Sequence, residues 1–209
     1  MPRPVLGSGG GAAAKRAASV TPLDRDRPLV DAARREPERF EALYRRYLAR
    51  VYSYAYYELG DHHDAEDATE RTFLAALANL DRFEERADPD EGHEASTFRV
   101  WLFRIARNVV ANQRRLRRRH PEAPLDDAEA LPAGSDVEAE AARRDEAAAA
   151  WRAVARLPAD RRRAVVLRFV EELSTAEIAG ILGRSEGAVR VLLHRALRTV
   201  GKDLRSRRA

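Results

Sequence analysis

The sequence of 209 residues contains no cysteine, which excludes disulfide bonds and metal sites built on thiolates. The absence of cysteine also fits a cytoplasmic location. The sequence lacks any apolar run of the length that a membrane span needs, so we expect no membrane insertion. No phosphate-binding loop, no nucleophile elbow and no histidine suited to activating a serine can be found. We therefore expect neither an enzyme nor a bound cofactor or metal.

Stretches that alternate apolar and polar residues, as strands do, are missing as well. Apolar residues instead recur at three- and four-residue steps, and Gly60 with Asp61 interrupts the first such series. In the helix that follows, Leu74 and Leu77 are expected to face the core. The pattern predicts an all-α fold of two small helical domains, residues 28–119 and 146–209, joined by a flexible acidic linker at 120–145 and preceded by a disordered tail at 1–27.

Lysine is scarce, because only Lys15 and Lys202 stand among the 38 basic residues, and the net charge of +4 conceals a segregation by sign. Residues 96–120 contain eight arginines and no acid, whereas residues 121–146 contain nine acids. A cationic block suits phosphate backbones, and an acidic block suits a basic protein partner or repels misplaced nucleic acid. The charge pattern thus indicates contact with nucleic acid.

Residues 174–198 are predicted to form two short helices that meet at a tight turn. Ser174 and Glu177 have the spacing of a capping box, and Gly183 offers the positive φ of a helix end, although the interior Gly180 counts against the first helix. Ser185 then caps the second helix, as in a helix-turn-helix whose second helix enters the DNA major groove. Its outward residues are Arg190, His194, Arg195 and Arg198. The alternative is a plain helical hairpin with a solvated arginine face.

A second basic helix is predicted over residues 97–119. Its polar side chains combine phosphate binders with amides that can contact base edges, namely Arg99, Arg104, Arg107, Asn108, Gln113, Arg114 and Arg115. Phe98 lies on the apolar stripe and is expected in the core, whereas Phe103 lies on the basic side and is expected to stack on bases. Trp101 suits either role, and a solvated arginine face is again the alternative for the helix.

An acidic helical segment follows residue 63, in which Asp64, Asp67 and Glu70 precede Phe73. A charged face that carries an aromatic side chain suits docking on another protein, and a merely solvated face is the alternative. His62 and His63 stand beside these acids, but adjacent histidines at a helix start do not converge on one ion, so no metal is expected.

Three motifs in this order resemble bacterial RNA polymerase sigma factors of the extracytoplasmic-function (ECF) type: residues 64–74, residues 96–108 and the C-terminal helix-turn-helix. The resemblance covers residues 38–205. It implies that residues 28–119 are the second sigma domain and that residues 146–209 are the fourth. The chain departs from the usual pattern at Glu70 and Arg71, where the family generally has glutamine and glutamate.

The resemblance also implies partners and residue roles. Asp64, Asp67, Glu70 and Phe73 would dock on the clamp helices of the polymerase β′ subunit, and the fourth domain would dock on the β flap. The loop at 83–94 would capture a base flipped from the minus-ten element, and the acidic linker would occupy the channel through which RNA later leaves. The minus-ten contacts would be Phe83, Arg99, Trp101, Phe103, Arg104, Arg107, Asn108, Arg114 and Arg115. The minus-thirty-five contacts would be Ser185, Glu186, Gly187, Arg190, His194 and Arg195.

The implied function is that of a sigma factor, which binds core polymerase, selects promoters of a stress or envelope-response regulon and helps to melt the DNA. An anti-sigma factor is the implied regulator. Two other hypotheses fit the residues alone. One is a free-standing helix-turn-helix regulator, which needs a dimer that no helix here supplies. The other is a protein-interaction adapter whose basic helices are merely solvated.

Overall fold

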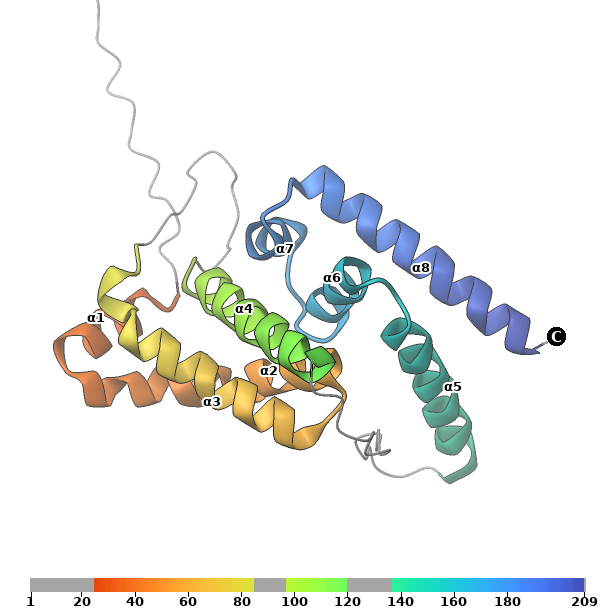
Figure 1. Ribbon diagram of the computed structural model, residues 1–209, viewed down its shortest axis with the longest axis horizontal. Coiled ribbons are helices and arrows are strands. Elements are labelled where there is room, and N and C mark those ends of the chain that lie inside the picture. The colour runs from red at the N-terminus through yellow and green to blue at the C-terminus, as the bar shows by residue number, and fades with distance from the viewer. Residues whose placement is uncertain (1–24, 85–96, 120–136, 209) are drawn as a thin grey trace, which may run out of the picture.

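The computed structural model describes residues 25–84, 97–119 and 137–208 (Figure 1). The expectations for the tail before residue 25, the loop at 85–94 and the linker at 120–136 lie outside these residues. The described part contains helices and no strand, as predicted. The elements in chain order are α1 (Arg27–Arg35), η1 (Pro37–Arg39), α2 (Phe40–Leu59), α3 (His62–Ala78), η2 (Leu80–Arg82), α4 (Thr97–Arg119), α5 (Val137–Ala155), α6 (Ala159–Phe169), α7 (Thr175–Leu182) and α8 (Glu186–Arg208).

The described residues before position 120, here called the N-terminal half, form a bundle of α2, α3 and α4 with α1 beside it (Figure 1). Gly60 ends α2 because its φ of 74° lies in the left-handed region, which glycine adopts without strain. Its N–H donates to the Tyr56 carbonyl over 2.7 Å. The Asp61 carboxylate then accepts from the Asp64 N–H over 2.9 Å and starts α3. The interruption expected at these residues is therefore confirmed.

The residues from 137 onward, here called the C-terminal half, contain the two helices predicted around residue 183. The Glu177 N–H donates to Ser174 Oγ over 3.2 Å and the Ser174 N–H donates to Glu177 Oε2 over 2.8 Å, so the capping box is confirmed. Gly183 has a φ of 65°. Helix α5 begins at Val137, so residues 137–145 are helical and not part of a flexible linker; their alanines and glutamates favour a helix.

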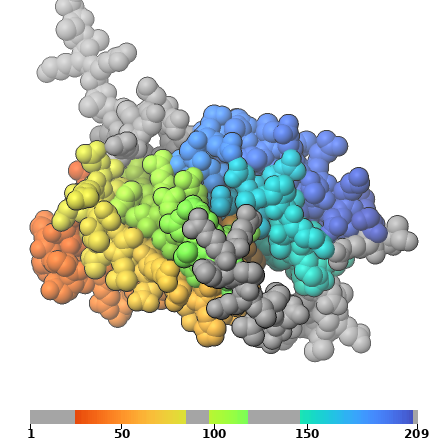
Figure 2. Space-filling view, in the orientation of Figure 1, coloured from red at the N-terminus to blue at the C-terminus, as the bar shows by residue number. Residues whose placement is uncertain are grey.

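The two halves share one hydrophobic core. Phe98 and Leu102 of α4 are fully buried in the same cluster as Ile178 and Ile181 of α7 and Val166 of α6. In Figure 2 the green atoms of α4 adjoin the blue atoms of the C-terminal half. A smaller cluster lies between α5, α6 and α8. The halves thus pack against each other through α2 and α4 on one side and α6 and α7 on the other.

Among the described helices, none combines the length and the apolar character that crossing a membrane requires.

Candidate nucleic-acid interface

The outward face of α8 is cationic and accessible. Arg190, His194, Arg195 and Arg198 are exposed, while Val189 and Ala196 are buried against the rest of the C-terminal half. Ser185 Oγ accepts from the Ala188 N–H over 3.3 Å, which is the N-cap predicted for this helix. Glu186 pairs with Arg190 at 2.8 Å, but exposed pairs of this kind contribute at most about 1 kcal/mol, so Arg190 can exchange Glu186 for DNA.

One apolar side chain on this face was missed at the sequence level. Val191 is 47% exposed and adjoins Arg190. Val191 follows Gly187 by four residues and precedes His194 by three, so it lies on the outward side of α8. This helical spacing could have identified Val191 from the sequence. A branched apolar side chain among arginines on a recognition helix suits contact with a thymine methyl group.

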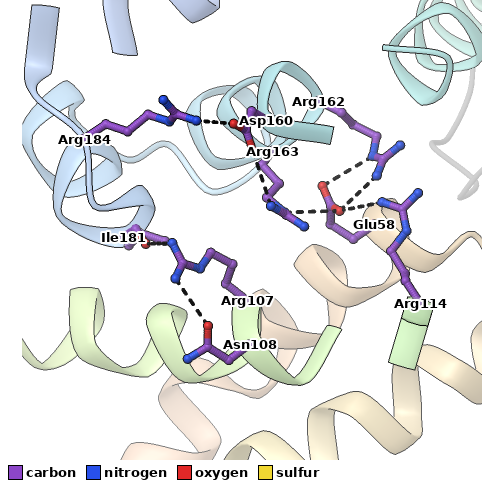
Figure 3. A network of polar contacts seen from close by, with 9 residues as sticks. All are labelled: Glu58, Arg107, Asn108, Arg114, Asp160, Arg162, Arg163, Ile181 and Arg184. Atoms are coloured by element: carbon purple, nitrogen blue, oxygen red, sulfur yellow. Dashed lines mark hydrogen bonds and ion pairs between the residues drawn. The ribbon is translucent and has the colours of Figure 1, made fainter. Parts of the chain in front are cut away.

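Three arginines of α4 point at the C-terminal half. Arg99 Nε donates to Glu177 Oε1 over 2.7 Å. Arg104 Nε donates to the Gly180 carbonyl and Arg107 Nη1 to the Ile181 carbonyl, each over 2.7 Å (Figure 3 shows the second). Three of the side chains predicted to contact DNA therefore contact α7 instead in this conformation.

Gly180, which weakens α7 as a helix, is explained by this contact. A Cβ at residue 180 would lie 3.0 Å from Val100 Cγ1, a distance that real Cβ atoms rarely show. Because glycine has no side chain, the backbone of α7 can approach α4 closely enough for its carbonyls to reach Arg104 and Arg107.

Glu58 of α2 is the centre of a second polar network between the halves (Figure 3). Glu58 is 4% exposed, and its carboxylate lies 3.2 Å from both Arg114 Nη1 and Arg162 Nη2. Arg163 Nε approaches it to 3.7 Å. Burial raises the pKa of Glu58 above its usual value, and the charges of Arg162 and Arg163 oppose that rise. A fourth predicted DNA contact, Arg114, is thus engaged inside the molecule.

A third contact joins Arg50 of α2 to Glu171, which follows α6. Arg50 Nε lies 3.2 Å from Glu171 Oε2, and the same guanidinium donates to the Glu171 carbonyl. Glu171 is 1% exposed. Its burial raises the pKa to about 7, although Arg50 acts in the opposite direction.

Two predicted aromatic contacts are buried. Phe103 is fully buried and meets Tyr54 edge-on, with ring centroids 5.7 Å apart, so the expectation that it stacks on bases is wrong. Helix α4 is covered by α2 and α3 on one side and by α7 on another, so its buried surface is wider than one stripe. Phe83 is 6% exposed and packs against Phe98, which is in the core as predicted.

Trp101 is half-buried, with its ring centroid 5.1 Å from that of Phe83. Asn108 and Arg115 are exposed on the same helix.

The acidic face of α3 has a different composition from the one predicted. Asp67 and Glu70 are exposed, but Asp64 is held by Arg117 Nε at 2.5 Å. Phe73 is only 5% exposed, because its ring packs edge-on against Tyr44 at 4.8 Å. Its expected direct role in docking is therefore contradicted by its burial.

Leu74 and Leu77, expected in the core, are instead 57% and 42% exposed, and Tyr44 is 39% exposed. Thr72, Phe73 and Ala76 supply the buried side of α3 at this point, which turns the two leucines outward. We call the exposed side chains on this face the docking patch: Tyr44, Asp67, Glu70, Leu74 and Leu77.

No group of three or more histidine or acidic side chains that could hold a metal ion occurs within the described residues. The His62 Nδ1 atom lies 2.5 Å from the Tyr52 hydroxyl.

Comparison with known proteins gives two family models, described as Sigma-70 region 2 and Sigma-70, region 4. They match residues 43–120 and 147–200. The ECF RNA polymerase sigma factor BldN of Streptomyces coelicolor is 35% identical over 197 residues, which cover 91% of this chain and 70% of that protein. The ECF RNA polymerase sigma factor SigW of Bacillus subtilis is 31% identical over 170 residues, which cover 76% of this chain and 85% of that protein.

Two solved structures are similar in fold. One is CnrH in complex with the cytosolic domain of CnrY, with a TM-score of 0.60 and 26% identity, covering 87% of this chain and 97% of that chain. The other is the sigma factor RpoE bound to the anti-sigma factor NepR from Bartonella quintana, with a TM-score of 0.61 and 24% identity, covering 79% and 96%.

Proposed function

Because the chain belongs to the family of ECF RNA polymerase sigma factors, we propose that it binds core RNA polymerase, directs it to promoters and helps to open the DNA there. The observation that carries the proposal is the presence in one chain of both sigma regions, of which the second bears the exposed cationic face of α8. A free-standing helix-turn-helix regulator would not need the first region. The protein performs no chemical step of its own and acts in the cytoplasm.

The docking patch is the surface that we assign to the β′ clamp helices. Exposed leucines beside acidic side chains give a partner both an apolar contact and a charge to pair with. Phe73 supports this surface from below by holding Tyr44, so its role is to position the patch. Asp64 likewise has a supporting role, because its ion pair with Arg117 joins α3 to α4.

Helix α4 is the element that we assign to the upstream edge of the melted minus-ten region. The side chains that we assign to phosphates and base edges are Arg99, Trp101, Arg104, Arg107, Asn108, Arg114 and Arg115. Four of these arginines would exchange the internal contacts described above for DNA. Unstacking one base costs a few kcal/mol, and stacking and phosphate contacts have to offset that cost. Phe83 and Phe103 support the fold of this region from the core.

We assign helix α8 to the minus-thirty-five promoter element and the rest of the C-terminal half to the β flap. Its contacts are Ser185, Glu186, Gly187, Arg190, Val191, His194 and Arg195. An anti-sigma factor is the regulator that we propose, because the similar structure of RpoE was determined with one bound.

The experiment is run-off transcription with purified core polymerase, a set of promoters and this chain. We expect promoter-directed transcripts only when the chain is added. The double variant Leu74→Glu/Leu77→Glu should bind core polymerase at least about ten-fold more weakly, because it puts charge into an apolar contact. Leu116→Glu is the matched control for this binding, since Leu116 of α4 is 51% exposed and lies outside both the docking patch and the C-terminal half. A chain that neither binds core polymerase nor alters its start sites would refute the proposal.

A further inference from the structure

Helix α1 is tied at its start to α2 through a buried carboxylate. Asp26, which is 1% exposed and directly precedes α1, accepts a hydrogen bond from the Tyr47 hydroxyl and lies 2.8 Å from Arg46 Nη1. The Tyr47 ring in turn lies against that of Phe98, with centroids 5.8 Å apart. The segment matched by the Sigma-70 region 2 model begins at residue 43, so α1 lies before it, and none of the surfaces assigned above includes α1.

The other end of α1 is tied to the turn after α3 through Arg34. Its Nε donates to the Leu80 carbonyl over 3.1 Å, and the same guanidinium donates to the Phe83 carbonyl. The guanidinium carbon also lies 5.7 Å from the centroid of the Phe83 ring. Arginine suits this place because its planar fork reaches two acceptors at once. Arg34 therefore fixes both the backbone and the ring of Phe83.

Phe83 and Phe98 both contact Trp101 of α4. Their ring centroids lie 5.1 Å and 5.6 Å from that of the indole. Phe83 is 6% exposed and Phe98 is fully buried, whereas Trp101 is half-buried and leaves part of its ring open. A ring that packs against two buried rings has little freedom to turn, and it therefore loses less entropy when a base stacks on it. Both ends of α1 are thus connected to Trp101 through buried rings.

We propose that α1 is a brace for the minus-ten contact, and that Arg34 is the residue that positions Trp101 through Phe83. The inference rests on the proposed function, in which Trp101 stacks on an unpaired base, and it adds a residue that does not touch DNA. Without Arg34, Phe83 keeps its apolar contacts but loses the hydrogen bond that fixes its backbone. The indole can then adopt other orientations, and a stacking base has to select one of them at a cost in affinity.

The free chain gives a first test, because it contains only two tryptophans, at positions 101 and 151. In a Trp151→Phe background, Trp101 is the sole source of tryptophan fluorescence. Arg34→Gln should make Trp101 more accessible to quenching by acrylamide. Arg39→Gln is the matched control, since it removes the same charge from a nearby pair with Glu36 that is exposed on both sides. Equal quenching in the two variants would overturn the positioning role.

Holoenzymes formed with core polymerase test the consequence for promoter opening, measured as the permanganate reactivity of unpaired thymines in the minus-ten region. We expect Arg34→Gln to lower opening at least about five-fold and Arg39→Gln to leave it unchanged, with the same affinity for core polymerase in both. In a Trp101→Leu background, Arg34→Gln should lower opening by less than about two-fold, because the ring that Arg34 positions is gone. An equal loss with and without Trp101 would show that Arg34 only stabilises the fold, and would overturn the proposal.

Arg34→Lys separates positioning from a direct contact with a DNA phosphate. Lysine keeps the charge but lacks the planar fork, so opening by this variant should remain well below that of the unmodified protein. Full recovery of opening in Arg34→Lys would identify Arg34 as a simple cation beside DNA and overturn the proposal. If no holoenzyme, including that of the unmodified chain, opens or transcribes a promoter, the proposed function fails, and acrylamide quenching still decides whether Arg34 fixes Trp101.

Discussion

At the scale of single residues, Glu171 shows how burial and a counter-charge oppose each other. Its side chain leaves water almost completely, and that loss raises its pKa from 4.5 to about 7 although Arg50 lies within 3.2 Å. In the folded protein the carboxyl thus takes up its proton at higher pH than in the unfolded chain. The folded state gains relative stability below the unfolded pKa and loses it as pH rises through about 7.

We expect this titration to be visible when the unmodified protein is compared with Glu171→Gln, a variant that lacks the titrating carboxyl group. Between pH 8 and pH 5 the free energy of unfolding of the unmodified protein should rise relative to that of the variant by about 1–3 kcal/mol, since each unit of pKa difference corresponds to about 1.4 kcal/mol. Urea unfolding at several pH values measures it. Glu70→Gln, at an exposed residue of α3 far from Glu171 in the chain, is the control and should run parallel to the unmodified protein. A difference that stays constant with pH would contradict the raised pKa.

At the scale of elements, local signals predicted the helix boundaries and the helix-turn-helix well. Ser174, Glu177 and Gly183 act within one turn of chain, so their effect can be deduced from neighbours in the sequence. The facing of side chains was less predictable where an element is covered on more than one side. Phe103 is buried because α2 lies over it, and Leu74 is exposed because Phe73 occupies the inward position.

Helix α8 supports a prediction about which of its arginines read bases. Arg190 is near the N-terminal end of the helix, the part of a recognition helix that contacts base edges, whereas Arg198 is two turns later and suits a phosphate. Arg190→Ala should therefore cost about 1–3 kcal/mol at one base pair of the minus-thirty-five element. Arg198→Ala, the matched control, should weaken all promoters alike. Run-off transcription from promoters varied base by base measures both, and an unchanged preference profile in Arg190→Ala would refute the assignment.

At the scale of the whole molecule, the sequence predicted two helical units but not their packing. The pairs that join them are separated by large distances along the chain, such as Glu58 with Arg162 and Arg99 with Glu177, and no local pattern specifies them. One residue carried a hint. Gly180 is unfavourable in a helix, and such a glycine indicates a close approach by another backbone or side chain, here Val100 of α4.

The same glycine permits a test of the packing between α4 and α7 that leaves all charges in place. Gly180→Gln adds a good helix former, so α7 itself should gain up to about 1 kcal/mol, while the new side chain must displace Val100. The packing of α7 against α4 should therefore weaken. Spin labels on Ala78→Cys of α3 and Thr199→Cys of α8, both exposed positions, should then report longer distances.

The matched control is Gly201→Gln, in α8, where an added Cβ meets only the tip of Arg205 at 3.6 Å. It makes the same gain in helix propensity without touching α4. If the label distances of Gly180→Gln match those of Gly201→Gln while both variants keep full helicity, the close approach of α7 to α4 does not hold the two halves together.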